Sequence, residues 1–129
     1  MRTVLIVDDS RAMRKILTKI MAKLGFEALE AGNGREGLEQ FEANSAQIDI
    51  SLIDWNMPEM NGLEMVKAIR ANDSYSQHKL MMVTTEGEPA RMAQALMAGV
   101  DEFVMKPFTE EIIVEKLKLI GVEFELQAS

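Results

Sequence analysis

The sequence predicts an α/β fold in which a parallel five-stranded sheet is covered by five helices. Short apolar runs alternate with longer segments of helical period five times along the chain, as in repeated βα units. The length of 129 residues is that of one ordinary domain, large enough to bury a core without disulfides or metal ions. We therefore expect a single domain over residues 1–129.

The predicted strands are the five short apolar runs. The first and fourth are apolar throughout, which is typical of strands buried on both faces of a parallel sheet. The second contains Glu27 and Glu30, so we expect it at an edge of the sheet. In chain order the runs are TVLIV (3–7), FEALE (26–30), IDISLI (48–53), LMMVT (80–84) and EFVM (102–105).

The first predicted helix lies between the first two strands. Apolar residues from Met13 to Leu24 recur at the spacing of one helical face. Ser10 is expected to cap the N-terminus of this helix, and Gly25 to follow its last turn.

Four further helices follow the later strands. The fourth helix of the chain opens at Pro89, a favourable first-turn residue, and we expect Met92, Leu96 and Met97 on its apolar side. The four segments are expected over about 35–43 and 62–71, from Pro89 and from Thr109. The tail 122–129 alternates apolar and acidic residues, which indicates either a frayed helical turn or a loose end.

Composition excludes several classes of function. A net charge of −7 argues against a nucleic-acid partner, because phosphate contacts need clustered Lys and Arg. The lack of cysteine excludes disulfides, thiolate catalysis and cysteine-ligated metals. No apolar stretch approaches the roughly 20 residues of a membrane span, so we expect a cytoplasmic protein without membrane insertion.

Residues 32–37, GNGREG, match the glycine fingerprint of dinucleotide-binding folds. That fingerprint belongs to the first βα turn of its unit, whereas this one follows the second run. We therefore interpret it as a tight turn with a small residue packed beneath a helix.

Polar side chains follow four of the five predicted strands directly. Because functional groups of an open parallel sheet gather outside the carboxyl ends of its strands, we expect these side chains to converge at one edge. They are Asp8 and Asp9 after the first strand, Asp54 after the third, Thr84 and Thr85 at the end of the fourth, and Lys106 after the fifth.

This set has a chemical interpretation. Two or three carboxylates suit Mg²⁺, which prefers hard oxygen ligands and shares its coordination shell with phosphate. Asp54 is the best candidate for a nucleophile that forms an aspartyl phosphate, with Lys106 beside a phosphoryl oxygen and Thr84 donating a hydrogen bond to it.

Simpler interpretations remain beside these. Asp8 and Asp9 are also compatible with a capping turn before the first helix, but this interpretation is disfavoured because it leaves Asp54 and Lys106 unexplained. Trp55 is expected to be a partly exposed neighbour of the site. His78, the only histidine, lies in a polar stretch without a companion ligand and is expected to be a loop residue.

Four motifs occur in the order and at the spacing of a known family: VDDS (7–10), LIDWNMPEMNG (52–62), MMVTT (81–85) and VMKPF (104–108). With them the chain resembles, over nearly its whole length, the receiver domain of two-component response regulators. It is most similar to the stand-alone, chemotaxis-type (CheY-like) receivers. The resemblance implies a flavodoxin-like sheet with strand order 2-1-3-4-5.

The resemblance also implies a role for each site residue. Asp54 is the phosphoacceptor, and Lys106, preceding a cis proline bond, pairs with the phosphate. Thr84 and Phe103 are the switch residues. Asn56 and Glu86 tune the lifetime of the phosphoryl group. Mg²⁺ is held by Asp8, Asp9, Asp54 and the backbone carbonyl of Asn56.

By the same resemblance, the chain accepts a phosphoryl group from a histidine kinase (CheA-like) and then binds a downstream protein. Chemotaxis or motility signalling is expected, with the flagellar motor switch as a candidate target and a phosphatase as a further partner. Phe103 replaces a tyrosine, which removes a hydroxyl from the partner surface. Thr85 is bulkier than the usual family residue and restricts access to the site. No output domain is expected after the fifth helix.

Three alternatives stay open. The chain is also compatible with a phosphorelay intermediate, or with a receiver-like protein-binding module that is not phosphorylated. An aspartate-nucleophile phosphohydrolase is disfavoured, because such enzymes place a general acid two residues after the nucleophile and this chain has Asn56 there. We therefore expect a signalling protein with self-phosphorylation and self-dephosphorylation chemistry, and not a turnover enzyme.

Overall fold

The computed structural model describes residues 2–127. It contains five strands and five α-helices in strict alternation, with one additional 3₁₀ helix, Asp73–Tyr75, before the fourth strand. The strands are β1 Arg2–Val7, β2 Phe26–Ala31, β3 Ile48–Ile53, β4 Lys79–Thr84 and β5 Glu102–Met105. The helices are α1 Arg11–Lys23, α2 Gly34–Asn44, α3 Gly62–Arg70, α4 Pro89–Ala98 and α5 Glu110–Leu119.

The predicted fold class and strand order are confirmed. All strand pairs are parallel, and the sheet has the order β2-β1-β3-β4-β5. The strand with Glu27 and Glu30 is at an edge, as expected. Since all strands run in the same direction, their carboxyl ends share one edge of the sheet.

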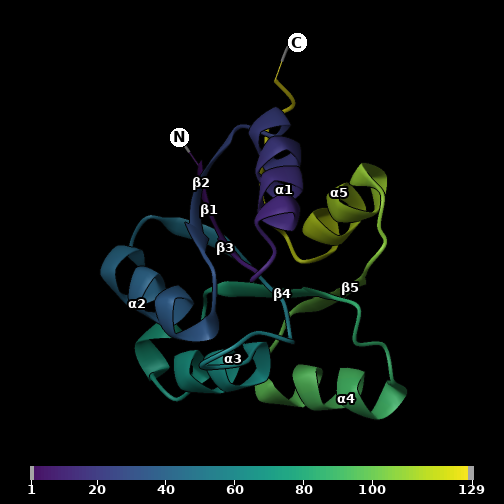
Figure 1. Ribbon diagram of the computed structural model, residues 1–129. Helices are drawn as coiled ribbons and strands as arrows, with labels where there is room; N and C mark the ends of the chain where they lie inside the picture. Colours follow the sequence, from purple (N-terminus) through teal and green to yellow (C-terminus); the bar gives the residue numbers. More distant parts are fainter. Residues whose placement is uncertain (1, 128–129) are drawn as a thin grey trace.

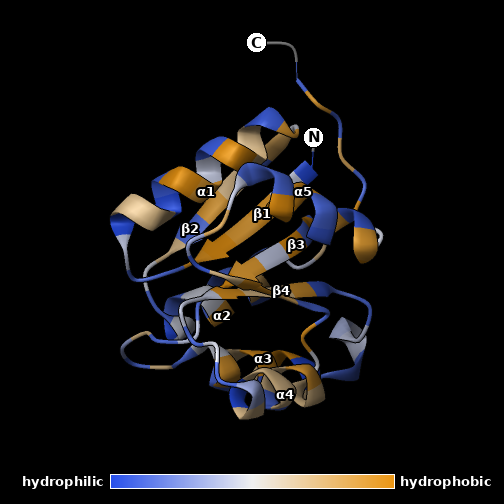
Figure 2. Ribbon diagram, turned by 90° about the vertical axis from the view of Figure 1, so that its right-hand side faces the viewer, coloured by the Kyte–Doolittle hydropathy of each residue, from blue (hydrophilic) through white to orange (hydrophobic). Residues whose placement is uncertain are grey.

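The sheet has an apolar core layer on each face, and helices cover both layers (Figure 1). Helices α1 and α5 cover one face, while α2, α3 and α4 cover the other. Side chains alternate between the two layers along each strand. In β1, for example, Leu5 and Val7 belong to the α2–α4 side and Val4 and Ile6 to the α1–α5 side. Hydrophobic residues accordingly dominate the strands between the helical layers (Figure 2).

The predicted start and end of α1 and the predicted start of α5 are confirmed. The Ser10 side chain accepts a hydrogen bond from the Met13 N–H, and the Thr109 side chain accepts one from the Ile112 N–H. Gly25 follows the last turn of α1 with a φ of +86°, a conformation that glycine adopts without steric cost. Local capping residues therefore fix where these helices begin and end.

The expected apolar side of α4 is confirmed for Met92 and wrong for Leu96 and Met97. Leu96 is 51% exposed and Met97 89% exposed, whereas the small Ala95 is fully buried against the core. Met92 packs at the margin of the core cluster. The inward face of α4 thus consists of Ala95, Ala98 and the partly buried Met92, while Leu96 and Met97 project outward.

The GNGREG segment is a turn beneath a helix, as expected. Asn33 caps α2, and a Cβ built on Gly34 would overlap the carbonyl oxygen of Met60. The Gly34 N–H donates to this same oxygen at 3.0 Å. The glycine therefore allows the α2 start to contact the loop that follows β3.

The tail is neither a frayed helix turn nor a loose end over residues 122–127. The Glu125 N–H donates to the Leu24 carbonyl at 3.2 Å, and the Gln127 N–H to the Lys23 carbonyl at 2.7 Å. The tail thereby satisfies carbonyls at the C-terminus of α1. Residues 128–129 of the predicted tail lie outside the described residues.

Candidate functional site

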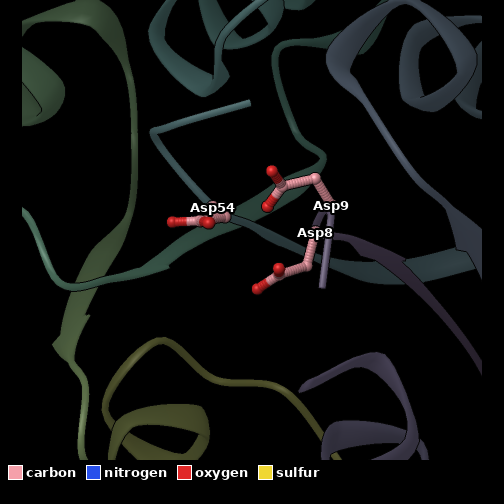
Figure 3. A group of neighbouring side chains, drawn as sticks. All are labelled: Asp8, Asp9 and Asp54. Carbon is pink, nitrogen blue, oxygen red and sulfur yellow. The ribbon is translucent and has the colours of Figure 1, made fainter. Parts of the chain in front are cut away.

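Three carboxylates converge at the carboxyl edge of the sheet (Figure 3). One oxygen from each of Asp8, Asp9 and Asp54 lies within 4.8 Å of the other two. Asp8 and Asp54 are 2% and 8% exposed, while Asp9 is exposed to solvent. At such separations the repulsion between two carboxylates is about 3–4 kcal/mol at an effective dielectric constant near 20, so the cluster needs compensating positive charge.

Backbone hydrogen bonds continue the sheet to these residues. The Asp8 N–H donates to the Ala31 carbonyl at 3.1 Å, and the Asp54 N–H donates to the Val7 carbonyl at 2.9 Å. Asp8 also accepts the Ser10 N–H on its carboxylate at 2.8 Å. Asp8 therefore does form part of a turn before α1, but the helix cap itself is Ser10, and the simpler interpretation does not account for Asp54.

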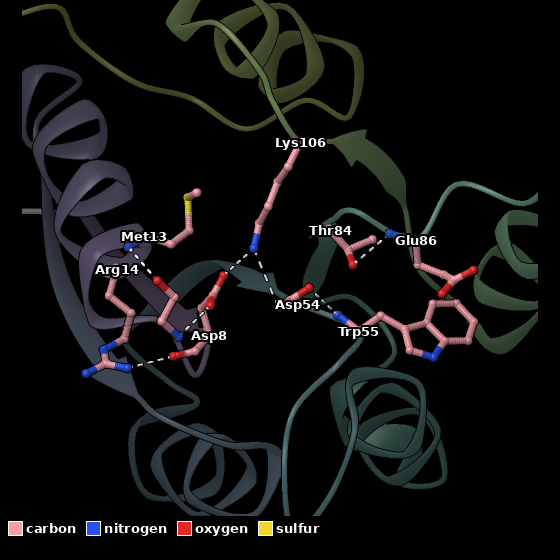
Figure 4. Close-up of polar contacts among 9 residues, drawn as sticks. Asp8, Met13, Arg14, Asp54, Trp55, Thr84, Glu86 and Lys106 are labelled. Atoms are coloured by element: carbon pink, nitrogen blue, oxygen red, sulfur yellow. Dashed lines mark hydrogen bonds and ion pairs between the residues drawn. The ribbon is translucent and has the colours of Figure 1, made fainter.

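Lys106 provides the compensating positive charge inside the site. Its Nζ lies 2.7 Å from Asp8 Oδ2 and 3.5 Å from Asp54 Oδ2, and its side chain is only 12% exposed (Figure 4). The Lys106 N–H donates to the Thr84 carbonyl, which ties the residue to the end of β4. The Lys106–Pro107 peptide bond is cis, as the resemblance implies.

Burial raises the pKa of Asp54 above its ordinary value of 3.8. Three groups lower this pKa: the Thr84 hydroxyl, the Lys106 ammonium and the backbone N–H of Trp55. The neighbouring Asp8 carboxylate raises it further. Burial dominates because the charged form loses more hydration than these partners return. Asp54 is thus a carboxylate held in an environment that disfavours its charge.

A replacement of Asp54 by Asn should therefore stabilise the protein at neutral pH. Because the folded-state pKa is raised, the folded protein retains this proton to a higher pH than the unfolded chain does, and the contribution of Asp54 to stability falls as pH rises through the folded pKa. Asp54→Asn removes the destabilisation that an ionised Asp54 causes in the folded protein. Urea unfolding should show the variant to be more stable than wild type at about pH 7, with a difference that shrinks at about pH 4. A less stable variant at neutral pH would contradict this interpretation of the site.

The turn after Asp54 folds back upon it. The Gly62 N–H donates to the Trp55 carbonyl at 2.9 Å, and Asn61 and Glu64 form a reciprocal capping box at the start of α3. A Cβ built on Gly62 would overlap the carbonyl oxygen of Asp54. The position of the candidate nucleophile therefore depends on glycine at the end of the turn.

Gly62→Ala is expected to lower the free energy of unfolding by about 2 kcal/mol, because backbone atoms cannot move aside as a flexible side chain does. Urea denaturation measures the loss. Gly32→Ala is the matched control, since its added Cβ would meet only ordinary contacts with side-chain atoms at 3.4 and 3.6 Å. Equal stability losses in the two variants would show that the close approach at Gly62 is unimportant.

The donor set fits a hard divalent cation. All three groups offer carboxylate oxygens, and Asp9 leaves one side of the cluster open to solvent, where a hydrated ion retains water ligands. Asn56 is exposed at the start of the turn. Among residues 2–127 no histidine joins the cluster: His78 precedes β4, and its Nε2 lies 2.8 Å from the Ser45 carbonyl oxygen.

The expected exposure of Trp55 is wrong. The side chain is 2% exposed and belongs to the core on the α2–α4 side, with Arg91 of α4 at 5.6 Å from the ring centre. The backbone N–H of Trp55 donates to Asp54 Oδ1 at 2.8 Å. Trp55 therefore connects the candidate nucleophile to the layer beneath α4.

The remaining predicted residues lie around this centre. Thr84 is fully buried, and its hydroxyl oxygen accepts the Glu86 N–H at 3.2 Å. Thr85 is exposed, and Phe103 is 5% exposed within the same core cluster as Trp55. Arg14, whose guanidinium donates to the Asp8 carbonyl, was not predicted, because in the sequence it is only a basic residue on a surface helix.

Comparison with known proteins decides the family. Residues 4–118 match the model of the response regulator receiver domain. The chain belongs to the response regulator receiver family. This receiver is 44% identical over 117 residues to the chemotaxis protein CheY1 of Helicobacter pylori, covering 90% of this chain and 94% of that protein. It is also 44% identical over 115 residues to the CheY homolog of Campylobacter jejuni, covering 88% of each chain.

Solved structures of related proteins have the same fold. The receiver matches CheY4 of Vibrio cholerae with a TM-score of 0.84 at 33% identity, covering 93% of this chain and 98% of that one. It matches the CheX-CheY-BeF3-Mg²⁺ complex from Borrelia burgdorferi with a TM-score of 0.88 at 28% identity, covering 95% and 90%. Both the family and the fold of the resemblance are therefore confirmed.

Proposed function

We propose that this receiver accepts a phosphoryl group on Asp54 as part of a two-component signalling system. The observation that supports this proposal best is the convergence of three carboxylates with Lys106 at the carboxyl edge of the sheet. Asp54 is the member that combines burial with contacts to Lys106 and Thr84. The other two carboxylates, Asp8 and Asp9, then serve as metal ligands.

In the proposed reaction, a carboxylate oxygen of Asp54 attacks the phosphorus atom of a phosphohistidine on a histidine kinase. The new P–O bond forms as the P–N bond breaks, and the imidazole leaves with the electron pair. Lys106 places its ammonium beside the oxygens of the transferred group. Mg²⁺, when bound, neutralises further charge on those oxygens. Its proposed ligands are Asp8, Asp9, Asp54 and the backbone carbonyl of Asn56.

The proposed switch connects Asp54 to the surface formed by α4, β5 and α5. Phosphorylation adds negative charge and acceptor oxygens, toward which the buried Thr84 hydroxyl is expected to move. Phe103 packs in the adjacent core cluster, so its packing reports the position of Thr84. Repacking there shifts an equilibrium between two shapes of this surface. The exposed apolar side chains on it suit protein binding: Leu96, Met97, Met105 and Ile112.

The similarity to CheY proteins supports a role in chemotaxis or motility. We propose a CheA-like histidine kinase as phosphodonor and a separate protein as output target, with residues 1–129 acting as a single domain. The flagellar motor switch is the first target to test, and a phosphatase is a further partner. Asn56 and Glu86 are proposed to set the lifetime of the phosphoryl group, after which the chain returns to its starting state without turning over a substrate.

Trp55 provides a direct test, because it follows the proposed acceptor in the chain and its backbone N–H donates a hydrogen bond to the Asp54 carboxylate. Fluorescence of this single tryptophan is followed during addition of Mg²⁺ and then of a small acyl phosphate. The proposal predicts a saturable change with Mg²⁺ and a second change with the acyl phosphate only when Mg²⁺ is present. Asp54→Asn should lack the second change. A second change of equal size in Asp54→Asn would contradict the assignment of the acceptor.

A further inference from the structure

Arg14 makes two contacts that link the end of β2 to the loop with Asp8 and Asp9, and Figure 4 shows the one with Asp8. Its Nη1 donates to the backbone carbonyl of Asp8 at 2.7 Å, and its Nε donates to Glu30 Oε1 at 3.0 Å. The Arg14 side chain is 18% exposed, and its contact with the Asp8 carbonyl is partly buried, whereas the contact with Glu30, whose side chain is 41% exposed, faces solvent. An arginine in this position uses its planar fork to hold two groups in a fixed relation.

The carbonyl that Arg14 contacts belongs to the peptide between Asp8 and Asp9. The peptide unit is planar and includes the Cα atoms of both residues, so holding its oxygen restricts rotation of the whole unit. That rotation determines how the Asp9 carboxylate is directed relative to the Asp8 carboxylate. Within residues 2–127 the Asp9 carboxylate has no hydrogen bond or ion pair of its own.

Two residues at the end of β2, Glu30 and Ala31, therefore hold the backbone of Asp8. The Ala31 carbonyl accepts the Asp8 N–H at 3.1 Å, and the neighbouring Glu30 positions the guanidinium that donates to the Asp8 carbonyl. The carboxylate of Asp8 contacts Lys106, which follows β5. The backbone and the side chain of Asp8 are thus fixed by different elements.

We propose that Arg14, supported by Glu30, is a positioning residue for the Asp8–Asp9 pair and thereby raises the affinity of the site for Mg²⁺. This inference rests on the proposed function, since it takes Asp8 and Asp9 as metal ligands. Groups that orient metal ligands without touching the metal typically contribute about 10–100-fold to affinity.

The direction in which Mg²⁺ affinity changes when Arg14 is removed distinguishes a positioning role from a purely electrostatic one. Arg14 carries a positive charge beside the Asp8–Asp9 peptide, so if only its charge mattered its removal would make cation binding tighter. If Arg14 positions the ligands, its removal makes binding weaker. Arg14→Met keeps an unbranched apolar stem and deletes the guanidinium. Lys15→Met is the matched control, because Lys15 is its exposed neighbour on α1 and makes no ion pair among the described residues.

The test is a Mg²⁺ titration of the full chain followed by Trp55 fluorescence, at a temperature where circular dichroism shows each variant folded. Arg14→Met should raise the dissociation constant about tenfold, Glu30→Gln about twofold, and Lys15→Met should leave it unchanged. Arg14→Lys, which retains one donor but not the fork, should recover part of the loss.

An unchanged or lower dissociation constant in Arg14→Met would overturn the inference while leaving the proposed function intact. If Arg14→Met is not folded at any accessible temperature, the dissociation constants of Glu30→Gln and Arg14→Lys decide instead. Values that are unchanged or lower than that of wild type would overturn the inference. Failure of the wild-type chain to bind Mg²⁺ would overturn the proposed metal site, and the inference with it.

Discussion

Replacement of Lys106 by Met is expected to slow phosphoryl transfer to Asp54 by about 10²–10³-fold, which is typical for removal of one charge-stabilising donor from a preorganised site. The Lys106 ammonium lies 3.5 Å from Asp54 Oδ2 and is 12% exposed, so water compensates poorly for its loss. The rate is measured with a small acyl phosphate at saturating Mg²⁺, by quenching samples and determining the phosphorylated fraction from intact mass.

The same substitution should tighten Mg²⁺ binding. Lys106 Nζ lies 2.7 Å from Asp8 Oδ2 and competes for one of the proposed metal ligands. Opposite changes in affinity and rate distinguish charge stabilisation from general damage to the site. Lys118→Met, an exposed lysine on α5, is the control and should alter neither quantity. A Lys106→Met protein that is phosphorylated at the wild-type rate would refute the role assigned to Lys106.

Replacement of Arg70 by Ala is expected to lower the free energy of unfolding by about 3 kcal/mol. Its guanidinium donates to the carbonyls of Gly99 at 2.9 Å, Tyr75 at 2.8 Å and His78 at 2.7 Å, and contacts the Asp101 carboxylate at 3.1 Å. The Arg70 side chain is 16% exposed, so its removal leaves acceptors without donors in a partly buried place.

Urea unfolding measures this loss. Lys67→Ala, at an exposed position on the same helix, is the control and should change stability by less than about 0.5 kcal/mol. Arg70→Lys should recover little, because an ammonium cannot reach carbonyls arranged around a planar fork. A change below about 1 kcal/mol in Arg70→Ala would show that water replaces these hydrogen bonds at little cost.

Much of the site could be predicted because it follows from strand direction. Asp8, Asp54, Thr84 and Lys106 each end or follow a strand, and parallel strands bring such residues to one edge. The cap at Ser10 and the start of α5 at Thr109 could be predicted in the same way, because a helix cap needs only a side chain and an N–H three residues later. Short sequence patterns were therefore sufficient to predict the strand ends, the site residues that follow them and these helix starts.

Other features depend on contacts between distant parts of the chain. Arg14 and Arg70 reach partners 16 and 29 residues away, and their sequence patterns are those of ordinary surface residues. Trp55 lies in a turn rich in polar residues, yet the turn folds back at Gly62 and buries the ring. In α4 the buried position belongs to Ala95, and the periodicity of large apolar residues pointed to the wrong face.

The central claim, that Asp54 is the acceptor of the phosphoryl group, is tested most directly by mapping the modified residue. The chain is incubated with a small acyl phosphate and Mg²⁺, reduced with borohydride, which converts an aspartyl phosphate to homoserine, and analysed by peptide mass spectrometry. We predict homoserine at position 54 alone, formed only when Mg²⁺ is present, and none in Asp54→Asn. Homoserine at position 8 or 9, or none at position 54 in wild type, would contradict the account.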